Sequence, residues 1–425
     1  MKVLVVGSGA REHALVVALQ RDPGVTLVVA APGNPGIALT ARCEPVDPLD
    51  GAAVAALALE VAADLVVIGP EAPLVEGVAD AVREVGVAVF GPSAEAARLE
   101  GSKAFAKQVM AEAGVPTAMS HVCRDGDQVR AALEALGAPY VVKDDGLAAG
   151  KGVVVTDDLA VALVHAQACL ARSDDARVVV EEYLDGPEVS LFVVTDGTDV
   201  APLAPAQDFK RLLDGDAGPN TGGMGAYSPL PWAPASLVEE VVERVARPTV
   251  ETMRRRGTPF AGLLYVGLAL TSRGLRVVEF NARFGDPETQ VVLPRLRTPL
   301  GQVLHAAATG RLADVGPLRW SDDAAVAVVV AAEGYPVAPR TGDVVDGLAS
   351  ANDLPGVSVL HAGTDHDEAG RVVTAGGRVL SVVGTGPTLS QARERAYQGV
   401  TVVELAGGQH RSDVAEQAAL AASGV

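Results

Sequence analysis

Three polar side chains alternate with apolar ones where a strand-like run of residues 275–281 ends. Glu279, Asn281 and Arg283 are separated by Phe280 and Ala282. Because side chains alternate across a strand, the three polar groups share one face. A carboxylate and an amide oxygen suit magnesium, which fills its remaining positions with phosphate oxygens and water, and a guanidinium can stabilise a phosphoryl group in its transition state. The spacing favours a metal–phosphate site over a solvent-facing polar edge.

A second candidate lies in residues 143–152, KDDGLAAGKG. A Walker loop has four residues between its glycines, followed by Lys-Ser or Lys-Thr and a helix. Here only three residues separate Gly146 from Gly150, and Lys151 is followed by glycine and a strand-like run. We therefore expect a strand–loop–strand flap that closes over a polyphosphate, with Lys143 and Lys151 as point charges. A plain mobile hairpin is the alternative interpretation, but it has no need for two lysines.

Lysine is scarce elsewhere in the chain. Of the 34 basic residues only six are lysine, and five of those lie between residues 103 and 210. Arginine is a planar fork and lysine a compact point charge, so a position that keeps lysine can depend on that geometry. The formal net charge of −19, without a basic tail, argues against nucleic-acid binding, which depends on phosphate neutralisation. A small anionic ligand stays compatible with the composition.

The N-terminal GSGARE, residues 7–12, follows a strand pattern and opens a helix, as a dinucleotide-binding motif does. Two of that motif's requirements fail. Glu12 occupies the position where close helix–strand packing asks for a small residue, and the next strand ends without the carboxylate that binds a ribose. NAD binding is therefore disfavoured. The turn is either a small phosphate site on the helix N-terminus, assisted by Arg11 and His13, or a plain tight turn.

Two further segments have compositions typical of ligand contact. Residues 181–188, EEYLDGPE, end one strand pattern and precede another, as a hinge that binds a purine through its backbone would. Residues 218–227, GPNTGGMGAY, are dense in glycine, which costs conformational entropy on folding. Close approach of the backbone to a ligand explains this density better than a linker does, because Asn220 and Thr221 add specific polar groups.

The elements that position these residues fall into three predicted regions. Residues 1–102 alternate short Val/Leu/Ile-rich strand patterns with helices, which indicates a Rossmann-like parallel sheet covered on both faces. Residues 103–322 carry longer strand-like runs and glycine-rich loops, which predict an antiparallel α+β domain with a flap subdomain at about 120–189. Residues 323–425 predict a small mixed α/β domain. The expected fold class is therefore α/β plus α+β.

The cysteines and the apolar runs indicate the cellular compartment in which the protein is expected. Cys43, Cys123 and Cys169 are far apart and lack metal-ligand spacing, so we expect reduced, buried thiols. The N-terminal apolar run is too short for a secretory signal, and the longest apolar stretch is about half of a membrane span. These features predict a cytoplasmic protein without a membrane partner.

Together, these motifs resemble the phosphoribosylamine–glycine ligase (glycinamide ribonucleotide synthetase) family of the ATP-grasp superfamily, over essentially all 425 residues. The two most specific stretches are DGDAGPNTGGMGAYSP, residues 214–229, and EFNARFGDPETQ, residues 279–290. Supporting stretches are GSGAREHA, GPEAPLV, EGSKAF, DGLAAGKG, RTGD and HAGT. The pattern E-F-N-x-R alone would indicate only an ATP-grasp fold.

The resemblance implies a ligase that forms a carbon–nitrogen bond. It would join glycine to 5-phosphoribosylamine at the expense of ATP, through glycyl phosphate, to give glycinamide ribonucleotide, ADP and phosphate in de novo purine biosynthesis. The implied cofactors are ATP and Mg²⁺, with Mn²⁺ as an alternative. The implied architecture is a pre-ATP-grasp N-terminal domain, a central ATP-grasp domain with its flap and a small C-terminal domain, in a monomer.

The resemblance also assigns roles to individual residues. The implied ATP contacts are Lys103, Lys143, Gly150, Glu181, Glu182, Tyr183, Leu184 and, at the ribose, Glu188. The implied metal ligands are Glu279 and Asn281, and the implied catalytic residues are Arg283, Lys143 and Lys151. The implied glycine and phosphoribosylamine region comprises Gly9, Pro70, Glu71, Asp216, Asn220, Thr221, Asp286 and Pro287.

Four places depart from the family pattern, one of them in the C-terminal region, where Val337-Ala338-Pro339 lacks the family's tyrosine before Arg340. Asp144 stands where the family usually has alanine, and strand alternation places it opposite Lys143. Phe209 replaces the histidine of Gln-Asp-His-Lys-Arg, which puts the role of that segment in doubt. Ala282 replaces a common cysteine but faces away from the expected metal.

Three other functions compete with the ligase interpretation. Another ATP-grasp enzyme, such as a biotin carboxylase, would release ADP in response to bicarbonate rather than glycine. A dinucleotide oxidoreductase would bind NADH at the N-terminal glycine turn. A non-catalytic ATP sensor would bind MgATP and release no ADP.

Overall fold

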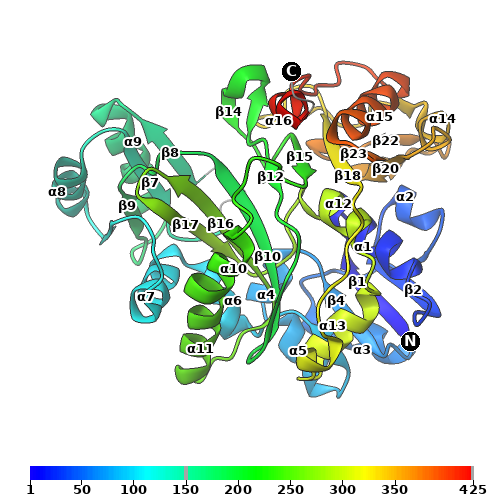
Figure 1. Ribbon diagram of the computed structural model, residues 1–425, viewed down its shortest axis with the longest axis horizontal. Coiled ribbons are helices and arrows are strands. Elements are labelled where there is room, and N and C mark those ends of the chain that lie inside the picture. The colour runs from blue at the N-terminus through cyan, green and yellow to red at the C-terminus, as the bar shows by residue number, and fades with distance from the viewer. Residues whose placement is uncertain (148–151, 423–425) are drawn as a thin grey trace.

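The computed structural model describes residues 1–147 and 152–422, and four sheets of four or five strands carry the fold of this part of the chain. Figure 1 shows the N-terminal sheet at the lower right, the C-terminal sheet above it, and the flap at the upper left. The long central strands lie between the flap and the other two sheets.

The N-terminal sheet is parallel throughout, as predicted, with the strand order β3-β2-β1-β4-β5. Both of its faces are covered: Val3 and Val5 belong to one buried core, and Leu4 and Val6 belong to another. Its strands are β1 (Lys2–Gly7), β2 (Leu27–Pro32), β3 (Arg42–Cys43), β4 (Leu65–Ile68) and β5 (Ala88–Phe90). Its main helices are α1 (Ala10–Gln20), α3 (Gly51–Glu60) and α5 (Val78–Glu84).

The central sheet is antiparallel, with the order β11-β10-β16-β17, and the predicted α+β character is confirmed. Its strands are β10 (Glu188–Asp196), β11 (Val200–Pro202), β16 (Ala261–Thr271) and β17 (Gly274–Asn281). Helices α7 (Lys103–Ala113) and α11 (Arg247–Arg255) pack against each other beside it.

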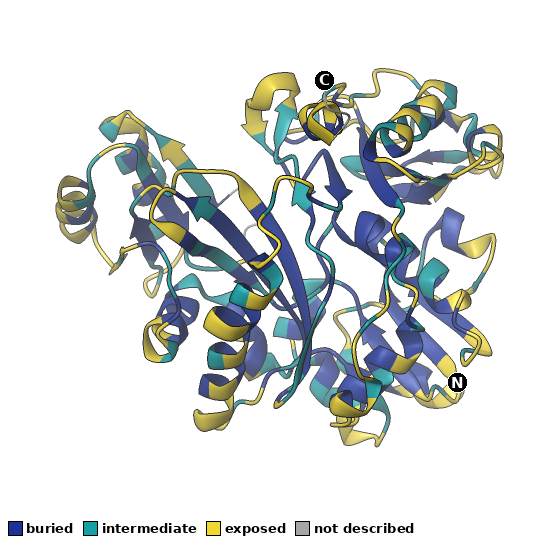
Figure 2. Cartoon of the chain, in the orientation of Figure 1, coloured by how far each residue is buried: buried dark blue, intermediate teal, exposed yellow. Residues whose placement is uncertain are grey.

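The flap has an antiparallel sheet of its own, in the order β6-β9-β7-β8. Its strands are β6 (Ser120–Cys123), β7 (Tyr140–Asp144), β8 (Val153–Thr156) and β9 (Val178–Glu181). Helices α8 (Gly126–Leu136) and α9 (Leu159–Leu170) bury a small separate core against it, while their outer faces stay exposed (Figure 2). The lysine-bearing strand β7 therefore belongs to a unit with its own hydrophobic core.

The last large sheet combines strands from two distant parts of the chain, in the order β12-β15-β18-β23-β20. Its strands are β12 (Gln207–Asp208), β15 (Gly225–Ser228), β18 (Ala324–Ala331), β20 (Val357–His361) and β23 (Arg378–Gly386), and helix α15 (Leu389–Val402) packs against it. Because β15 pairs with β18, the glycine-dense segment is held beside the C-terminal strands.

The remaining helices are α2 (Pro35–Ala38), α4 (Glu71–Val75), α6 (Ala94–Gly101), α10 (Leu237–Val241), α12 (Thr289–Val292), α13 (Leu300–Ala308), α14 (Leu348–Asn352) and α16 (Glu416–Ala422). The remaining strands are β13 (Arg211–Leu213), β14 (Ala217–Asn220), β19 (Val345–Asp346), β21 (Thr364–His366), β22 (Val372–Thr374) and β24 (Glu404–Leu405). None of the described helices has the length and apolar character needed to cross a membrane. Cys123 and Cys169 are buried, Cys43 is half-buried, and all three are free thiols.

Candidate active site

The predicted metal strand is β17, and its alternation is confirmed. Glu279 and Asn281 are half-buried on one face, whereas Phe280 and Ala282 are buried in the hydrophobic core. One carboxylate and one amide oxygen fit Mg²⁺ only if phosphate oxygens and water complete its shell. Among the described residues, no group of three or more His, Cys, Asp or Glu side chains could hold a metal ion by itself. The donors therefore suit a metal that arrives with a phosphate ligand.

A buried ion cluster joins the flap to α7. Glu181 at the end of β9 receives Lys143 Nζ at 2.8 Å and Lys107 Nζ at 3.0 Å, one on each carboxylate oxygen. Burial by itself raises the pKa of Glu181, but the two lysine charges outweigh it and lower that pKa. Lys143 Nζ also donates to the carbonyl of Val278 on β17 at 3.1 Å. The predicted ATP lysine thus lies beside the metal strand.

Lys107 is the member of this cluster that sequence reasoning missed. A lysine four residues after Lys103 on the same helix would be expected at the surface, but the side chain of Lys107 is buried and donates to Thr117 Oγ1 at 2.8 Å. Burial lowers the pKa of Lys107, although the charge of Glu181 acts in the opposite direction. The rarity of lysine was the only sequence signal that set this residue apart.

The root of the glycine-rich loop is attached to the start of α7. Lys103 Nζ donates to the carbonyl of Gly146 at 2.9 Å, and Asp145 accepts from Ser102 Oγ and from the Ala104 amide, both at 3.0 Å. A polar cavity of about 390 Å³ lies beside this junction. The predicted residues Gly150 and Lys151 lie outside the described residues.

Asp144, the added acid of the loop, faces away from Lys143, as strand alternation predicted. Its carboxylate pairs with Arg172, which follows α9. The extra charge is therefore neutralised on the face of the flap sheet opposite Lys143, where Asp144 and Arg172 also line the polar cavity.

The predicted purine hinge follows Glu181. Glu182 accepts from the Met119 amide at 3.0 Å and pairs with Arg273 at 2.8 Å, whereas Tyr183 is exposed and Leu184 half-buried. The backbone of this segment connects β9 with β10, so the hinge joins the flap to the central sheet.

Glu188 begins β10 and belongs to a second ionic cluster. Lys210 Nζ lies 2.7 Å from Glu188 Oε2 and 2.7 Å from Asp208 Oδ1. Burial raises the pKa of Asp208 to about 6, with Lys210 acting against this rise and with Glu288 and Glu188 adding to it. Glu288 is itself buried and accepts from Tyr265 Oη at 2.7 Å. The carboxylates here therefore outnumber the single ammonium that they share.

Arg283 lies between two glutamates from the N-terminal third of the chain. Its Nε is 3.3 Å from Glu71 Oε2, and its Nη2 is 3.2 Å from Glu100 Oε1. Glu100 also accepts from the Ala282 amide at 2.7 Å. Burial opposes the positive charge, but both glutamates raise the pKa of Arg283. Glu100 opens the EGSKAF stretch, yet sequence reasoning gave it no role.

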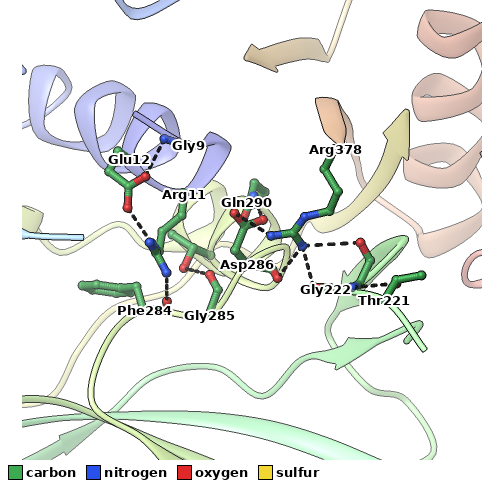
Figure 3. Close-up of polar contacts among 12 residues, drawn as sticks. Gly9, Arg11, Glu12, Thr221, Gly222, Phe284, Gly285, Asp286, Gln290 and Arg378 are labelled. Carbon is green, nitrogen blue, oxygen red and sulfur yellow. Dashed lines mark hydrogen bonds and ion pairs between the residues drawn. The ribbon is translucent and has the colours of Figure 1, made fainter. Parts of the chain in front are cut away.

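The N-terminal loop explains why the dinucleotide motif carries a glutamate. Glu12 accepts from the Gly9 amide at 2.7 Å and from Arg11 Nε at 2.5 Å. Its side chain fills the space in front of Gly69, where an added Cβ would lie 1.9 Å from Glu12 Oε1. Arg11 in turn donates to the Phe284 carbonyl at 3.3 Å (Figure 3). The Glu12 carboxylate therefore fixes the N-terminal turn and fills space that would stay empty if the motif's third glycine stood at this position.

His13, which the phosphate interpretation invoked, is engaged elsewhere. Its Nδ1 accepts from the backbone amide of His361, at 2.9 Å, on the C-terminal strand β20. Burial, with the charge of His361 as a smaller cause, lowers the pKa of His13 to about 3. At neutral pH this imidazole is uncharged and joins the N-terminal and C-terminal sheets.

The loop after β17 meets the glycine-dense segment and the C-terminal sheet (Figure 3). Asp286 Oδ1 accepts from Gln290 Nε2 at 2.8 Å, and Asp286 Oδ2 lies 3.2 Å from Arg378 Nη2. Thr221 Oγ1 donates to the Lys210 carbonyl at 2.9 Å and accepts from the Gly223 amide at 3.0 Å. Arg378 was missed, because no motif surrounds it in the sequence.

Gly9, Pro70 and Pro287 lie around this junction. A Cβ added to Gly9 would lie 3.8 Å from Asp286 Oδ2, and one added to Gly7 would lie 3.1 Å from Pro70 Cδ. Pro287 is buried against the glycine-dense segment. Glu71 lies in the same region, because its Oε2 is 3.3 Å from Arg283 Nε and 3.7 Å from Arg11 Nη1. The fold thus brings together predicted substrate residues that lie far apart in the sequence.

Asp216 and Asn220 lie on the β13–β14 hairpin. Asn220 is opposite Arg211 in the strand pairing. Asp216 pairs at 2.7 Å with Arg411, a fully buried guanidinium, while its own side chain is 71% exposed. Arg411 also lies 4.8 Å over the ring of Phe209. The replacement of histidine by Phe209 therefore supplies an aromatic face for a C-terminal arginine.

The β17 strand, the lysine-bearing flap and the hinge between β9 and β10 together define an ATP-grasp protein. Residues 101–289 match the description "Phosphoribosylglycinamide synthetase, ATP-grasp (A) domain". Residues 1–100 match the N domain of that synthetase, and residues 325–417 match its C domain. The chain belongs to the phosphoribosylglycinamide synthetase family.

Individual relatives agree with this assignment. The chain is 68% identical to a phosphoribosylamine–glycine ligase of Streptomyces coelicolor, over 99% of this chain and 100% of that protein. The crystal structure of a phosphoribosylamine–glycine ligase from Thermotoga maritima superposes with a TM-score of 0.82 at 33% identity, covering 97% of this chain and 100% of that one. The biotin carboxylase domain of a Hydrogenobacter thermophilus 2-oxoglutarate carboxylase has a TM-score of 0.71 at 19% identity, covering 96% and 91%. This last likeness concerns the fold alone.

Proposed function

We propose that this protein ligates glycine to 5-phosphoribosylamine with the hydrolysis of ATP, giving glycinamide ribonucleotide, ADP and phosphate. The observation that carries the proposal is the position of Arg283. Arg283 follows Asn281, the second proposed metal donor after Glu279, by two residues. It is held by Glu71 and Glu100 from the N-terminal third of the chain. In this proposal Arg283 is the phosphate-stabilising cation between the nucleotide side and the substrate side of the site.

In the first step a carboxylate oxygen of glycine attacks the γ-phosphorus of ATP. The bond from that phosphorus to the ADP oxygen breaks, and glycyl phosphate forms. Arg283 stabilises the transferring group, because a guanidinium offers a planar pair of donors to phosphoryl oxygens. The two glutamates keep the guanidinium aimed at this point.

In the second step the amine nitrogen of phosphoribosylamine attacks the acyl carbon of glycyl phosphate. The carbon–oxygen bond to phosphate breaks, phosphate leaves, and the nitrogen loses one proton as the amide forms. We place the two substrates around Gly9, Pro70, Glu71, Asn220, Thr221, Asp286 and Pro287. Holding the two reactants side by side supplies most of the rate acceleration of this step, because the acyl phosphate is already activated.

The nucleotide occupies the other side of Arg283 in this proposal. Lys143 and Lys103 hold ATP phosphates together with Gly150 and Lys151 of the loop. The backbone of residues 181–184 binds adenine, and Glu188 binds the ribose. The flap excludes water, which would otherwise hydrolyse the acyl phosphate.

Glu279 and Asn281 would hold Mg²⁺, or Mn²⁺ in its place, and the metal would neutralise phosphate charge. The support is the pair of half-buried oxygen donors on one face of β17, next to Lys143.

We also propose the division into domains at 1–102, 103–322 and 323–425, with the flap at about 120–189, a monomeric state and a cytoplasmic location. The separate core of the flap supports the flap bounds, and the three free thiols are consistent with a cytoplasmic location. Asp216 stays a prediction as a substrate residue, since its present partner is Arg411.

The decisive experiment is a coupled assay of ADP release with MgATP, glycine and freshly prepared phosphoribosylamine. We expect release only when both substrates are present. The absence of release would contradict the ligase proposal. Release that depends on bicarbonate would favour a carboxylase-type enzyme, and MgATP binding without release would favour a sensor. Saturable NADH binding would revive the oxidoreductase interpretation.

A further inference from the structure

The carbonyl groups of the glycine-dense segment meet an arginine from the C-terminal sheet. Arg378 is the first residue of β23, and its Nη1 donates to the carbonyl of Gly222 and lies 3.4 Å from the carbonyl of Gly223. From the turn that follows β18, the hydroxyl of Tyr335 accepts from the Gly222 amide at 2.9 Å. The backbone at Gly222 is therefore held by C-terminal groups at both its N–H and its C=O.

Close packing disfavours a side chain at Gly223, and it makes one at Gly222 tight against Arg378. A Cβ added to Gly222 would lie 3.1 Å from Arg378 Cζ. Gly223 has a φ of +108°, which side chains rarely permit, and its Cβ would lie 2.5 Å from Pro287 Cδ. The glycines thus allow the segment to contact Arg378 on one side and the loop after β17 on the other.

The same guanidinium also holds Asp286, through both of its terminal nitrogens. Nη1 donates to the Asp286 carbonyl at 2.9 Å, and Nη2 lies 3.2 Å from Asp286 Oδ2. Gln290 donates to the remaining carboxylate oxygen at 2.8 Å, so both oxygens of Asp286 are engaged. A planar guanidinium can serve several acceptors in fixed directions, whereas an ammonium group is a single point.

Arg378 is set apart from the nucleotide residues described above. Its partners are the glycine-dense segment and the loop that carries Asp286, three residues after Arg283. Asp286 Oδ2 in turn faces the Gly9 turn of the N-terminal sheet. One C-terminal side chain therefore connects two loops that, in the proposed function, surround the substrates (Figure 3).

We propose that Arg378 is a positioning residue for the glycine and phosphoribosylamine site. It acts through the Asp286 carboxylate and the backbone of Gly222 and Gly223, and through it the C-terminal domain takes part in substrate binding. This inference rests on the proposed function.

The test compares Arg378→Met, Arg378→Lys and Arg371→Met in the full-length protein. Arg371 is a matched control, because it is an exposed C-terminal arginine that pairs with Asp367. For Arg378→Met we expect KM for glycine or for phosphoribosylamine to rise more than about fivefold, while KM for MgATP changes less than that. Arg378→Lys should recover part of the loss, since it restores a charge near Asp286, and the control should match the wild type.

The outcomes separate the two proposals. If the wild-type protein shows no glycine-dependent ADP release, the proposed function is wrong, and the substrate role of Arg378 is wrong with it. If the wild type turns over, substrate KM values for Arg378→Met within about fivefold of it overturn the inference alone. A parallel rise of all three KM values with a lower Tm, unrelieved in Arg378→Lys, also overturns it, because that pattern marks general loss of structure. If Arg378→Met does not fold, the Arg378→Lys values decide by the same criteria.

Discussion

Two polar clusters of this molecule are built in different ways. Around Glu181, two lysines and a carboxylate are all buried, and charge neutralises charge. Around Arg378, the guanidinium is 22% exposed and binds mainly backbone carbonyls of two loops. Removing a partner from the first cluster leaves a buried charge, which is costly. Removing Arg378 chiefly frees loop backbone. We therefore expect substitutions in the Glu181 cluster to lower stability, and substitution of Arg378 to weaken substrate binding with little loss of stability.

The largest effect is expected at the nucleotide side, for Glu279→Gln. The amide keeps the size of the side chain but removes the metal's one carboxylate donor on β17, so turnover should fall at least about 100-fold with little change in Tm. Coupled ADP release over a range of Mg²⁺ concentrations measures this. Glu251→Gln, on the exposed face of α11, is the control. If Glu279→Gln turned over at the wild-type rate, the assignment of Glu279 as a metal ligand would be wrong.

Lys143→Met and Lys107→Met test the ion cluster as a matched pair. Each leaves Glu181 with one lysine, so we expect each to lower the free energy of unfolding by about 1–3 kcal/mol. Only Lys143→Met should also raise KM for MgATP, by about tenfold, because Lys143 alone is placed at the nucleotide. Denaturant titrations and steady-state kinetics measure the two effects. Equal KM values for the two variants would contradict a distinct nucleotide role for Lys143.

Asp208→Asn probes the cluster that lies between the two regions. Burial raises the pKa of Asp208 from its ordinary value of 3.8 to about 6, so the folded state binds a proton that the unfolded state releases. This group therefore favours folding at low pH, and its contribution is lost as pH rises from about 4 to 6. Relative to Asp208→Asn, the wild type should lose stability across that window.

The comparison with Asp208→Asn isolates this contribution from the carboxylates with lowered pKa, such as Glu181 and Glu188, whose effects have the opposite sign. Unfolding by urea at several pH values measures it. Parallel stability profiles for the two proteins would show that Asp208 does not titrate in this range.

Asp216→Ala should have the smallest effect. Its carboxylate is mostly exposed, and Arg411 keeps Asp413 as a second partner at 2.7 Å. The buried Arg411 therefore does not lose its last partner, and the exposed Asp216 carboxylate is screened by solvent, so we expect a change in Tm of a few degrees at most and substrate KM values within about twofold of the wild type. A large rise in KM for either substrate would restore Asp216 to the substrate site.

Several features could be predicted because they depend on local order. Strand alternation predicted the shared face of Glu279 and Asn281 and the placement of Asp144 opposite Lys143, since neighbouring side chains on a strand must point to opposite faces. Continuous apolar runs separated by helices predicted the parallel N-terminal sheet. The failed dinucleotide motif was also apparent, and the structure supplies the reason: Glu12 fills the space in front of Gly69.

Other residues could not be found in this way. Arg378 contacts groups 92 and 156 positions away, and Arg411 contacts Asp216 across 195 positions. No local pattern marks such a residue, because its partner is chosen by the packing of sheets that are distant in the chain. Lys107 and Glu100 escaped prediction for the same reason. Lys107 is buried by the position of the flap and Glu100 by the position of Arg283, and helix periodicity predicts neither.

The sequence by itself determined the kinds of chemistry present: oxygen donors on one strand face, scarce lysines around a glycine-rich loop, and a glycine-dense segment with polar side chains. These depend on residue identity and on the two-residue repeat of a strand, which act over a few positions. Only the tertiary structure decided which of these groups meet. The pairing of β15 with β18 places the glycine-dense segment against Arg378, and β17 brings Arg283 between Glu71 and Glu100, because sheet pairing acts between strands regardless of their separation in the chain.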